Sequence, residues 1–151
     1  AGVVGRLLTE RGLQLAVVDT LTEGQLAQEL AEAGYNGLFV NKLQPANLNE
    51  AAQAVGLAAV TDLQQADGAT LTAAVARAAA PATGIGLALL GPFADGATYI
   101  GLHGPGDFEL VKFGRIFRRE ADYNRRWLVI QGLDWLRRAI LGQLKSPVDW
   151  D

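Results

Sequence analysis

The stretch Leu13–Gln25, LQLAVVDTLTEGQ, decides the fold expected for this chain. Residues 13–18 are almost all apolar, and a short apolar run of this kind is typical of a buried strand. Thr22 and Gln25 then have the spacing of a capping box, which predicts a helix over about Glu23–Ala33. Ligands of open α/β sheets bind where a strand ends and its helix begins, so this junction is also the first candidate site.

The other expected elements surround this unit in a mixed α/β order, and glycine or proline separates most of them. We expect helices over about 3–11, 49–55, 70–80 and 120–144, strands over 37–43 and 84–90, and a hairpin of 97–103 with 108–117. This order predicts a three-layer α/β/α sandwich, with a mixed sheet of about five strands, helices on both faces and a long C-terminal helix.

Length and composition predict a single domain over 1–145, followed by a tail over 146–151. A chain of 151 residues, half of them apolar, has the size for one hydrophobic core. Pro147 indicates that the tail is loosely attached. The chain contains no methionine, so we expect a processed product or a domain of a longer protein.

Composition also argues against several classes of function. The absence of cysteine and the presence of one histidine, His103, argue against thiol chemistry and zinc-type sites, so no metal and no cofactor is expected. A net charge of −3 is too small to indicate a nucleic-acid partner. No apolar stretch is long enough to span a membrane and no signal peptide is apparent, so we expect a cytoplasmic protein without a membrane partner.

The strand–helix junction supplies the first candidate ligand-binding residues, Asp19, Thr20 and Thr22. The N–H groups at the start of the helix would suit a phosphate or a carboxylate. The alternative interpretation is that Thr22 only caps the helix and Asp19 only supports the turn, because capping explains these residue types fully. A second candidate is the loop Gly91–Gly96, whose main-chain amides would lie near a ligand, although such loops are often plain connections.

Arginine side chains form a third candidate, where the hairpin meets the last helix. Guanidinium groups bind phosphate well, whereas a run of arginines is also typical of a solvated face. The cluster consists of Arg115, Arg118, Arg119 and Arg125. His103 is expected to be a surface residue, because the sequence places no carboxylate or serine beside it.

The order and spacing of these pieces resemble the C-terminal domain of the CinA family, the nicotinamide-nucleotide amidase domain of bacteria. The resemblance runs from about Arg6 to Leu144. Family members have A-E-S-C-T-G-G after the first strand, where this chain has VDTLTEG over 18–24. The family strand G-x-V-x-T-Y-S corresponds to 37–43, the loop T-G-I-A-G-P-G-G to 89–93, and the helix A-L-x-L-L-R-R to 132–138.

The resemblance implies an α/β/α domain that often self-associates. In active members it implies hydrolysis of the amide of nicotinamide mononucleotide to nicotinic acid mononucleotide and ammonia. The family motifs suggest a hydroxyl nucleophile with a nearby lysine. Carried onto this chain, these catalytic residues are Thr20 and Lys42.

The departures from the family motifs occur where the chemistry would take place. The family serine aligns with Thr20 and the family tyrosine with Asn41. The family lysine aligns near Ala46, and the arginine of a G-D-R segment aligns with Ala121. Phe93 would crowd an amide cradle in the loop. An activated hydroxyl loses orders of magnitude in rate without its base.

The sequence therefore predicts a CinA-like domain with a degenerate active site, retained as a small-ligand-binding or assembly module. The alternative is an active amidohydrolase that uses Thr20 as nucleophile and Lys42 as base. A third hypothesis, outside the family, is an anion-binding α/β module. The expected partners are a nucleotide or other anionic small molecule and further copies of the chain, and the candidate ligand-binding residues are Asp19, Thr22, Asn41, Gly91, Arg118 and Arg119.

Overall fold

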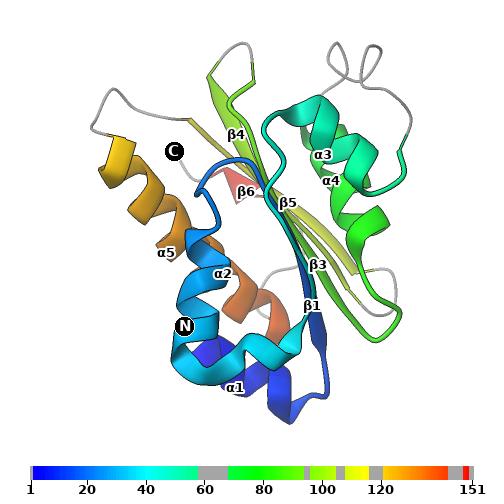
Figure 1. The fold of residues 1–151 in the computed structure, drawn as a ribbon, viewed down its shortest axis with the longest axis vertical. Helices are drawn as coiled ribbons and strands as arrows, with labels where there is room; N and C mark the ends of the chain where they lie inside the picture. The colour runs from blue at the N-terminus through cyan, green and yellow to red at the C-terminus, as the bar shows by residue number, and fades with distance from the viewer. Residues whose placement is uncertain are drawn as a thin grey trace.

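The computed structural model of the chain describes residues 2–57, 68–93, 96–104, 108–115, 121–142 and 148–149 (Figure 1). Its helices are α1 (Gly2–Glu10), α2 (Gln25–Leu30), α3 (Leu48–Ala54), α4 (Gly68–Ala79) and α5 (Ala121–Ile140). Its strands are β1 (Gln14–Asp19), β2 (Phe39–Leu43), β3 (Gly84–Leu90), β4 (Ala97–Gly104), β5 (Phe108–Arg115) and β6 (Val148–Asp149). A π-helical turn, Ala31–Tyr35, and a 3-10 turn, Asn36–Leu38, connect α2 to β2.

The strands form one mixed sheet in the order β2-β1-β3-β4-β5-β6. β1 is parallel to both β2 and β3, whereas β4 is antiparallel to β3 and β5. The predicted mixed sheet of about five strands is therefore confirmed. β6 adds two residues of the predicted tail, which pair in parallel with Lys112 and Phe113 of β5.

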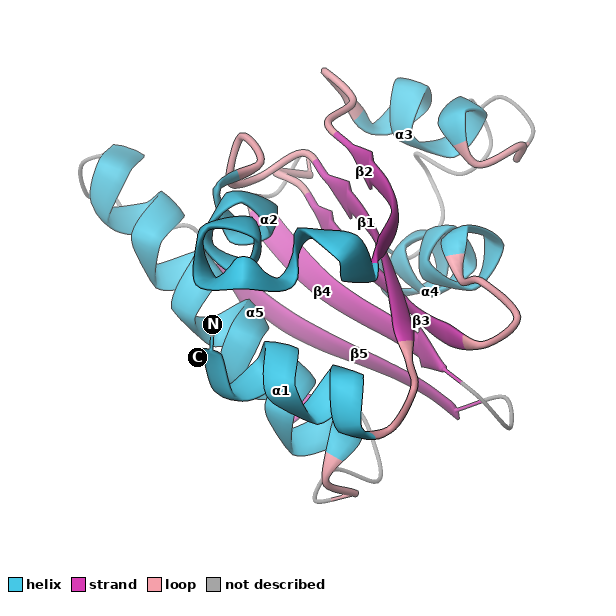
Figure 2. Cartoon of the chain, turned by 60° about the horizontal axis from the view of Figure 1, so that its bottom comes forward, coloured by secondary structure: helices cyan, strands magenta, loops and turns pink. Residues whose placement is uncertain are grey.

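Helices cover both faces of the sheet, which gives the predicted three layers (Figure 2). α1, α2 and α5 pack with Leu15 and Val17 of β1 in the larger apolar cluster. α3 and α4 pack with Val18 and Ala88 on the opposite face. Because β1 and β3 are buried on both sides, their sequences are continuous apolar runs and do not alternate with polar residues. No described helix is long and apolar enough to cross a lipid bilayer.

The helix after β1 begins two residues later than the sequence predicted. It was expected from about Glu23, but α2 begins at Gln25. Glu23 and Gly24 have φ angles of +55° and +81°, in the left-handed region, so neither residue extends a right-handed helix. The turn between β1 and α2 therefore takes up residues that the capping pattern had assigned to the helix.

Small residues let α4 approach the sheet closely. A side chain on Gly86 of β3 would overlap the carbonyl oxygen of Ala76, and one on Gly101 of β4 would lie 2.7 Å from Cγ2 of Thr72. The absence of a Cβ at these two strand positions thus fixes the distance between the sheet and α4, and with it the spacing of the layer behind β1 and β3.

We expect Gly86→Ala to lower the free energy of unfolding by about 3 kcal/mol, because the new methyl group would push against helix main chain. Urea denaturation followed by circular dichroism measures this change. Gly37→Ala is the matched control: no atom lies within 4 Å of the added carbon. The control is expected to stay within about 1 kcal/mol of the parent chain. Equal stability of the two variants would contradict the close packing of α4.

Candidate functional site

Asp19 is the last residue of β1, and its buried carboxylate organises the turn into α2. Oδ1 accepts hydrogen bonds from the main-chain N–H groups of Leu21 and Thr22, both at 2.8 Å. Oδ2 accepts from the N–H of Gly24 at 3.1 Å and from the Thr22 hydroxyl. These four bonds use the lone-pair positions that a carboxylate normally offers. The predicted support of the turn by Asp19 is thus present in the structure, and its acceptor capacity is taken up within the chain.

Thr22 is tied to the same turn and is fully buried. Its hydroxyl donates to Asp19 and accepts a long bond, 3.4 Å, from the N–H of Leu26. The residue at the N-cap of α2 is Gly24, and no side chain caps this helix. The capping box expected from Thr22 and Gln25 is therefore replaced by the bonds that Asp19 makes.

Thr20 links the ends of β1 and β3. Two carbonyl oxygens lie within hydrogen-bond reach of its hydroxyl as acceptors, that of Gly91 at 2.9 Å and that of Leu89 at 3.3 Å. The hydroxyl also accepts a hydrogen bond from the N–H of Gly91 at 3.0 Å. The main-chain N–H of Thr20 also donates to Leu89, at 2.9 Å. The structure thus brings Thr20 and Gly91 together, as the sequence-based site required, but each satisfies the polar groups of the other.

Gly91 is confined by the start of β4. It has φ +146°, and a Cβ there would lie 3.0 Å from the carbonyl oxygen of Ala97 and 3.1 Å from Cγ2 of Thr98. The buried hydroxyl of Thr98 has no hydrogen-bond partner within the described part of the chain. No local pattern in the sequence marks Thr98, because its position beside Gly91 depends on the pairing of β3 with β4.

Lys42 lies on β2 and is directed away from Thr20. It pairs in register with Val17, so its side chain points to the face of the sheet that α1, α2 and α5 cover. Its ammonium group donates to Oδ1 of Asn36 at 2.6 Å and lies 5.2 Å from the centre of the Phe39 ring. Val17, the residue of β1 that pairs with Lys42, is three residues before Thr20, which corresponds to roughly 10 Å along the strand direction.

The remaining predicted site residues fall into separate places. Asn41 is exposed on β2. Arg118 and Arg119 lie outside the described residues. His103, expected at the surface without a partner, has a side chain only 15% exposed and pairs in register with Glu109, whose Oε1 lies 3.8 Å from its Nδ1. Glu109 also binds Arg77 at 2.6 Å, at the far end of β4 from Gly91.

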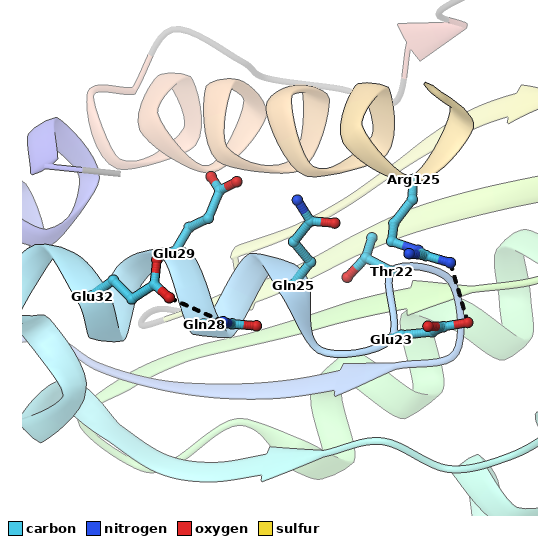
Figure 3. Close-up of a pocket in the computed structure, with 7 residues that line it drawn as sticks. All are labelled: Thr22, Glu23, Gln25, Gln28, Glu29, Glu32 and Arg125. Atoms are coloured by element: carbon cyan, nitrogen blue, oxygen red, sulfur yellow. Dashed lines mark hydrogen bonds and ion pairs between the residues drawn. The ribbon is translucent and has the colours of Figure 1, made fainter. Parts of the chain in front are cut away.

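An open groove of about 300 Å³ lies between the turn, α2 and α5 (Figure 3). Its walls carry three carboxylates and a single guanidinium group. The lining residues are Thr22, Glu23, Gln25, Gln28, Glu29, Glu32 and Arg125. Gln28 donates to Glu32 at 2.9 Å, and Glu23 forms an ion pair with Arg125 at 3.2 Å. In the described part of the chain no three histidine, aspartate or glutamate side chains converge as metal ligands.

Solved structures of bacterial proteins share this architecture over nearly the whole chain. Competence damage-inducible protein A from Klebsiella pneumoniae is 16% identical, with a TM-score of 0.77, and the match covers 94% of this chain and 95% of that one. The competence/damage inducible protein from Agrobacterium tumefaciens is 17% identical, with a TM-score of 0.75 over 93% and 97% of the two chains. This chain has the CinA fold.

A CinA superfamily protein from Escherichia coli gives the same result, at 17% identity and a TM-score of 0.70, with 95% of this chain and 88% of that chain covered. No protein-family model and no curated protein sequence matches the chain. At this level of identity the likeness establishes the CinA fold alone. The chemistry of the site must therefore be judged from the residues present.

Glu23 is one of the groove residues that were not predicted from the sequence, together with Gln28, Glu29 and Glu32. It occupies the place of the first glycine in the A-E-S-C-T-G-G stretch, and it is the non-glycine residue with positive φ in the described chain. The presence of glutamate where the motif has glycine was the feature of the sequence that could have drawn attention to this position. Arg125 belonged to the predicted arginine cluster, and it alone of that cluster has a described side chain.

We expect Asp19→Asn to lower the free energy of unfolding by about 3 kcal/mol, because its NH₂ group would face hydrogen-bond donors inside the turn. Chemical denaturation of the purified chain measures this loss. Asp134→Asn is the control, since Asp134 is a partly exposed residue of α5 that pairs with Arg137 and Arg138. The control should change stability by less than about 1 kcal/mol. A loss at Asp19 as small as the control's would argue against its role in the turn.

Comparison of two Glu23 variants isolates the left-handed backbone of the turn. Glu23→Gly and Glu23→Ala both remove the ion pair, but only alanine keeps the unfavourable contact of Cβ with the main chain. We expect the glycine variant to be the more stable by about 1 kcal/mol, after allowing for the flexibility of glycine in the unfolded chain. Thermal and urea unfolding of both variants measure the difference, and an alanine variant of equal or greater stability would refute the expectation.

Proposed function

We propose that this chain is a CinA-fold domain without amidase activity, retained to bind a small polar ligand in the groove between α2 and α5. The observation that carries the proposal is the environment of the Thr20 hydroxyl. Its proton points to main-chain carbonyl oxygens and its lone pair receives the N–H of Gly91. A hydroxyl nucleophile needs instead a side-chain base within hydrogen-bond reach.

The side chains that would complete an amidase site support the same conclusion. The ammonium group of Lys42 is engaged by Asn36 and lies over Phe39. The carboxylate of Asp19 accepts four hydrogen bonds from its own turn. Both groups are engaged with partners other than Thr20, which supports a structural role for the junction.

The groove offers several polar side chains, contributed by the turn, α2 and α5, that a ligand could bind. Gln25 and Glu29 line it, and among the described residues their side chains have no hydrogen-bond partner. Figure 3 shows both side chains extending from α2 toward the side of α5. An amide and a carboxylate that lack partners among the described residues offer donors and acceptors to water or to a bound molecule.

Incubation with nicotinamide mononucleotide tests the loss of amidase activity directly. The parent chain is expected to release ammonia no faster than a blank without protein, measured by an enzyme-coupled assay, and Thr20→Ala should behave identically. Thr9→Ala is a matched control, because the Thr9 hydroxyl donates to Gly5 within α1. Release at an ordinary enzymatic rate that Thr20→Ala abolishes and Thr9→Ala preserves would establish the alternative, an active amidohydrolase with Thr20 as nucleophile.

A further inference from the structure

A second pocket, of about 190 Å³, lies at the end of the sheet opposite to the junction of β1 with α2. It is formed beside the first residues of β3 and β5 and the last residues of β4 and α5, on the face of the sheet that α1 and α5 cover (Figure 2). Its walls are largely apolar and include the side chains of Leu13, Ile85, Leu102, Phe108 and Ile140.

The absence of a side chain at Gly104 helps to keep this pocket open. Gly104 is the last residue of β4 and pairs with Phe108, the first residue of β5. A Cβ there would lie 3.5 Å from Cγ1 of Ile85 and 3.7 Å from Cδ1 of Phe108, two residues that line the pocket. Because the φ angle of Gly104 is not positive, the main chain does not require glycine at this position. A larger side chain would therefore suit the backbone but would occupy space in the pocket.

Arg11 is the one charged residue among those that line the pocket. It follows α1, and its main-chain N–H donates to the carbonyl oxygen of Leu7 at 3.1 Å. Its guanidinium group makes no ion pair or hydrogen bond in the described part of the chain, whereas Arg6 of α1 lies 4.0 Å from Glu10. A guanidinium group binds a carboxylate through two parallel hydrogen bonds. Arg11 therefore gives an apolar pocket a preference for a ligand with a carboxylate.

We propose that this pocket binds a small monocarboxylate whose apolar body has the size of one aromatic ring, with the carboxylate on Arg11 and the ring between the sheet and α5. An apolar cavity of about 150 Å³ accommodates a benzene ring. The pocket, at about 190 Å³, has room for such a ring and a linking methylene group. The ring of Phe108 offers it an aromatic contact. The proposal is independent of the function proposed for the groove, because the two sites share no lining residue.

Phenylacetate and its neutral analogue phenylacetamide, titrated into the isotope-labelled chain and followed by amide NMR spectra, test this assignment. We expect phenylacetate to bind saturably and to shift the amide signals of Leu13, Gly104 and Phe108. Phenylacetamide has the same ring without the charge, and it should bind at least about fivefold more weakly, which corresponds to about 1 kcal/mol. Equal affinity for the two probes, or signal shifts confined to the groove between α2 and α5, would overturn the proposal.

Two arginine variants decide whether the preference for the carboxylate arises at Arg11. Arg11→Gln should lower the affinity for phenylacetate to that for phenylacetamide and leave the affinity for phenylacetamide unchanged. Arg6→Gln is the matched control: it removes the same charge from α1 but does not line the pocket, and at physiological salt it should bind phenylacetate like the parent chain. The proposal fails if Arg11→Gln keeps the preference or if Arg6→Gln loses as much affinity as Arg11→Gln.

Filling the pocket tests its apolar part separately. Gly104→Val should abolish the binding of both probes, and the amide spectrum of the free variant reports whether it is folded. Ala139→Leu places added volume in the same pocket from α5 and should have the same effect. A folded variant of either kind that binds phenylacetate like the parent would contradict the proposal. A parent chain that sediments as a dimer, and that Gly104→Val converts to a monomer, would assign the pocket to a second copy of the chain instead.

Discussion

The buried carboxylate of Asp19 is the interaction on which the organisation of this molecule depends. It lies at the end of β1, an inner strand of the sheet, and accepts four hydrogen bonds from the next five residues. A buried charge is tolerated only when it is hydrogen-bonded in this way. These bonds determine the path of the chain between β1 and α2. Along this path Glu23 and Gly24 have left-handed φ angles, so α2 begins only at Gln25. The position of α2, and so of the groove against α5, follows from them.

A second constraint joins the same turn to the rest of the sheet. The reciprocal bonds between Thr20 and Gly91 connect the carboxyl ends of β1 and β3, the place where α/β proteins usually bind ligands. In this chain Thr20 and Gly91 satisfy each other's polar atoms there, whereas the buried Thr98 hydroxyl beside Gly91 has no hydrogen-bond partner among the described residues. The CinA fold is preserved around the junction, and the polar side chains of Gln25 and Glu29 lie one layer away, on α2.

The charge distribution of the groove follows from the same geometry. A left-handed turn residue projects its side chain to the end of the groove, where α5 supplies Arg125. Farther along, successive turns of α2 present Gln25 and Glu29. The walls of the groove are therefore polar, and they are contributed by two helices and a turn.

Local patterns in the sequence determined the order of helices and strands, the mixed sheet and the strand–helix junction, because hydrophobic periodicity and glycine positions act over a few residues. They also identified Asp19 and Thr20 at the junction, and Gly91 in the loop after the third strand, as candidate site residues. Only the tertiary structure decided what these residues do. The direction of Lys42 depends on the register of β2 against β1, and the contact of Glu23 with Arg125 depends on how α5 packs beside α2. The residues in such contacts lie far apart in the chain. No local pattern in the sequence therefore predicts which polar side chains contact one another in the folded structure.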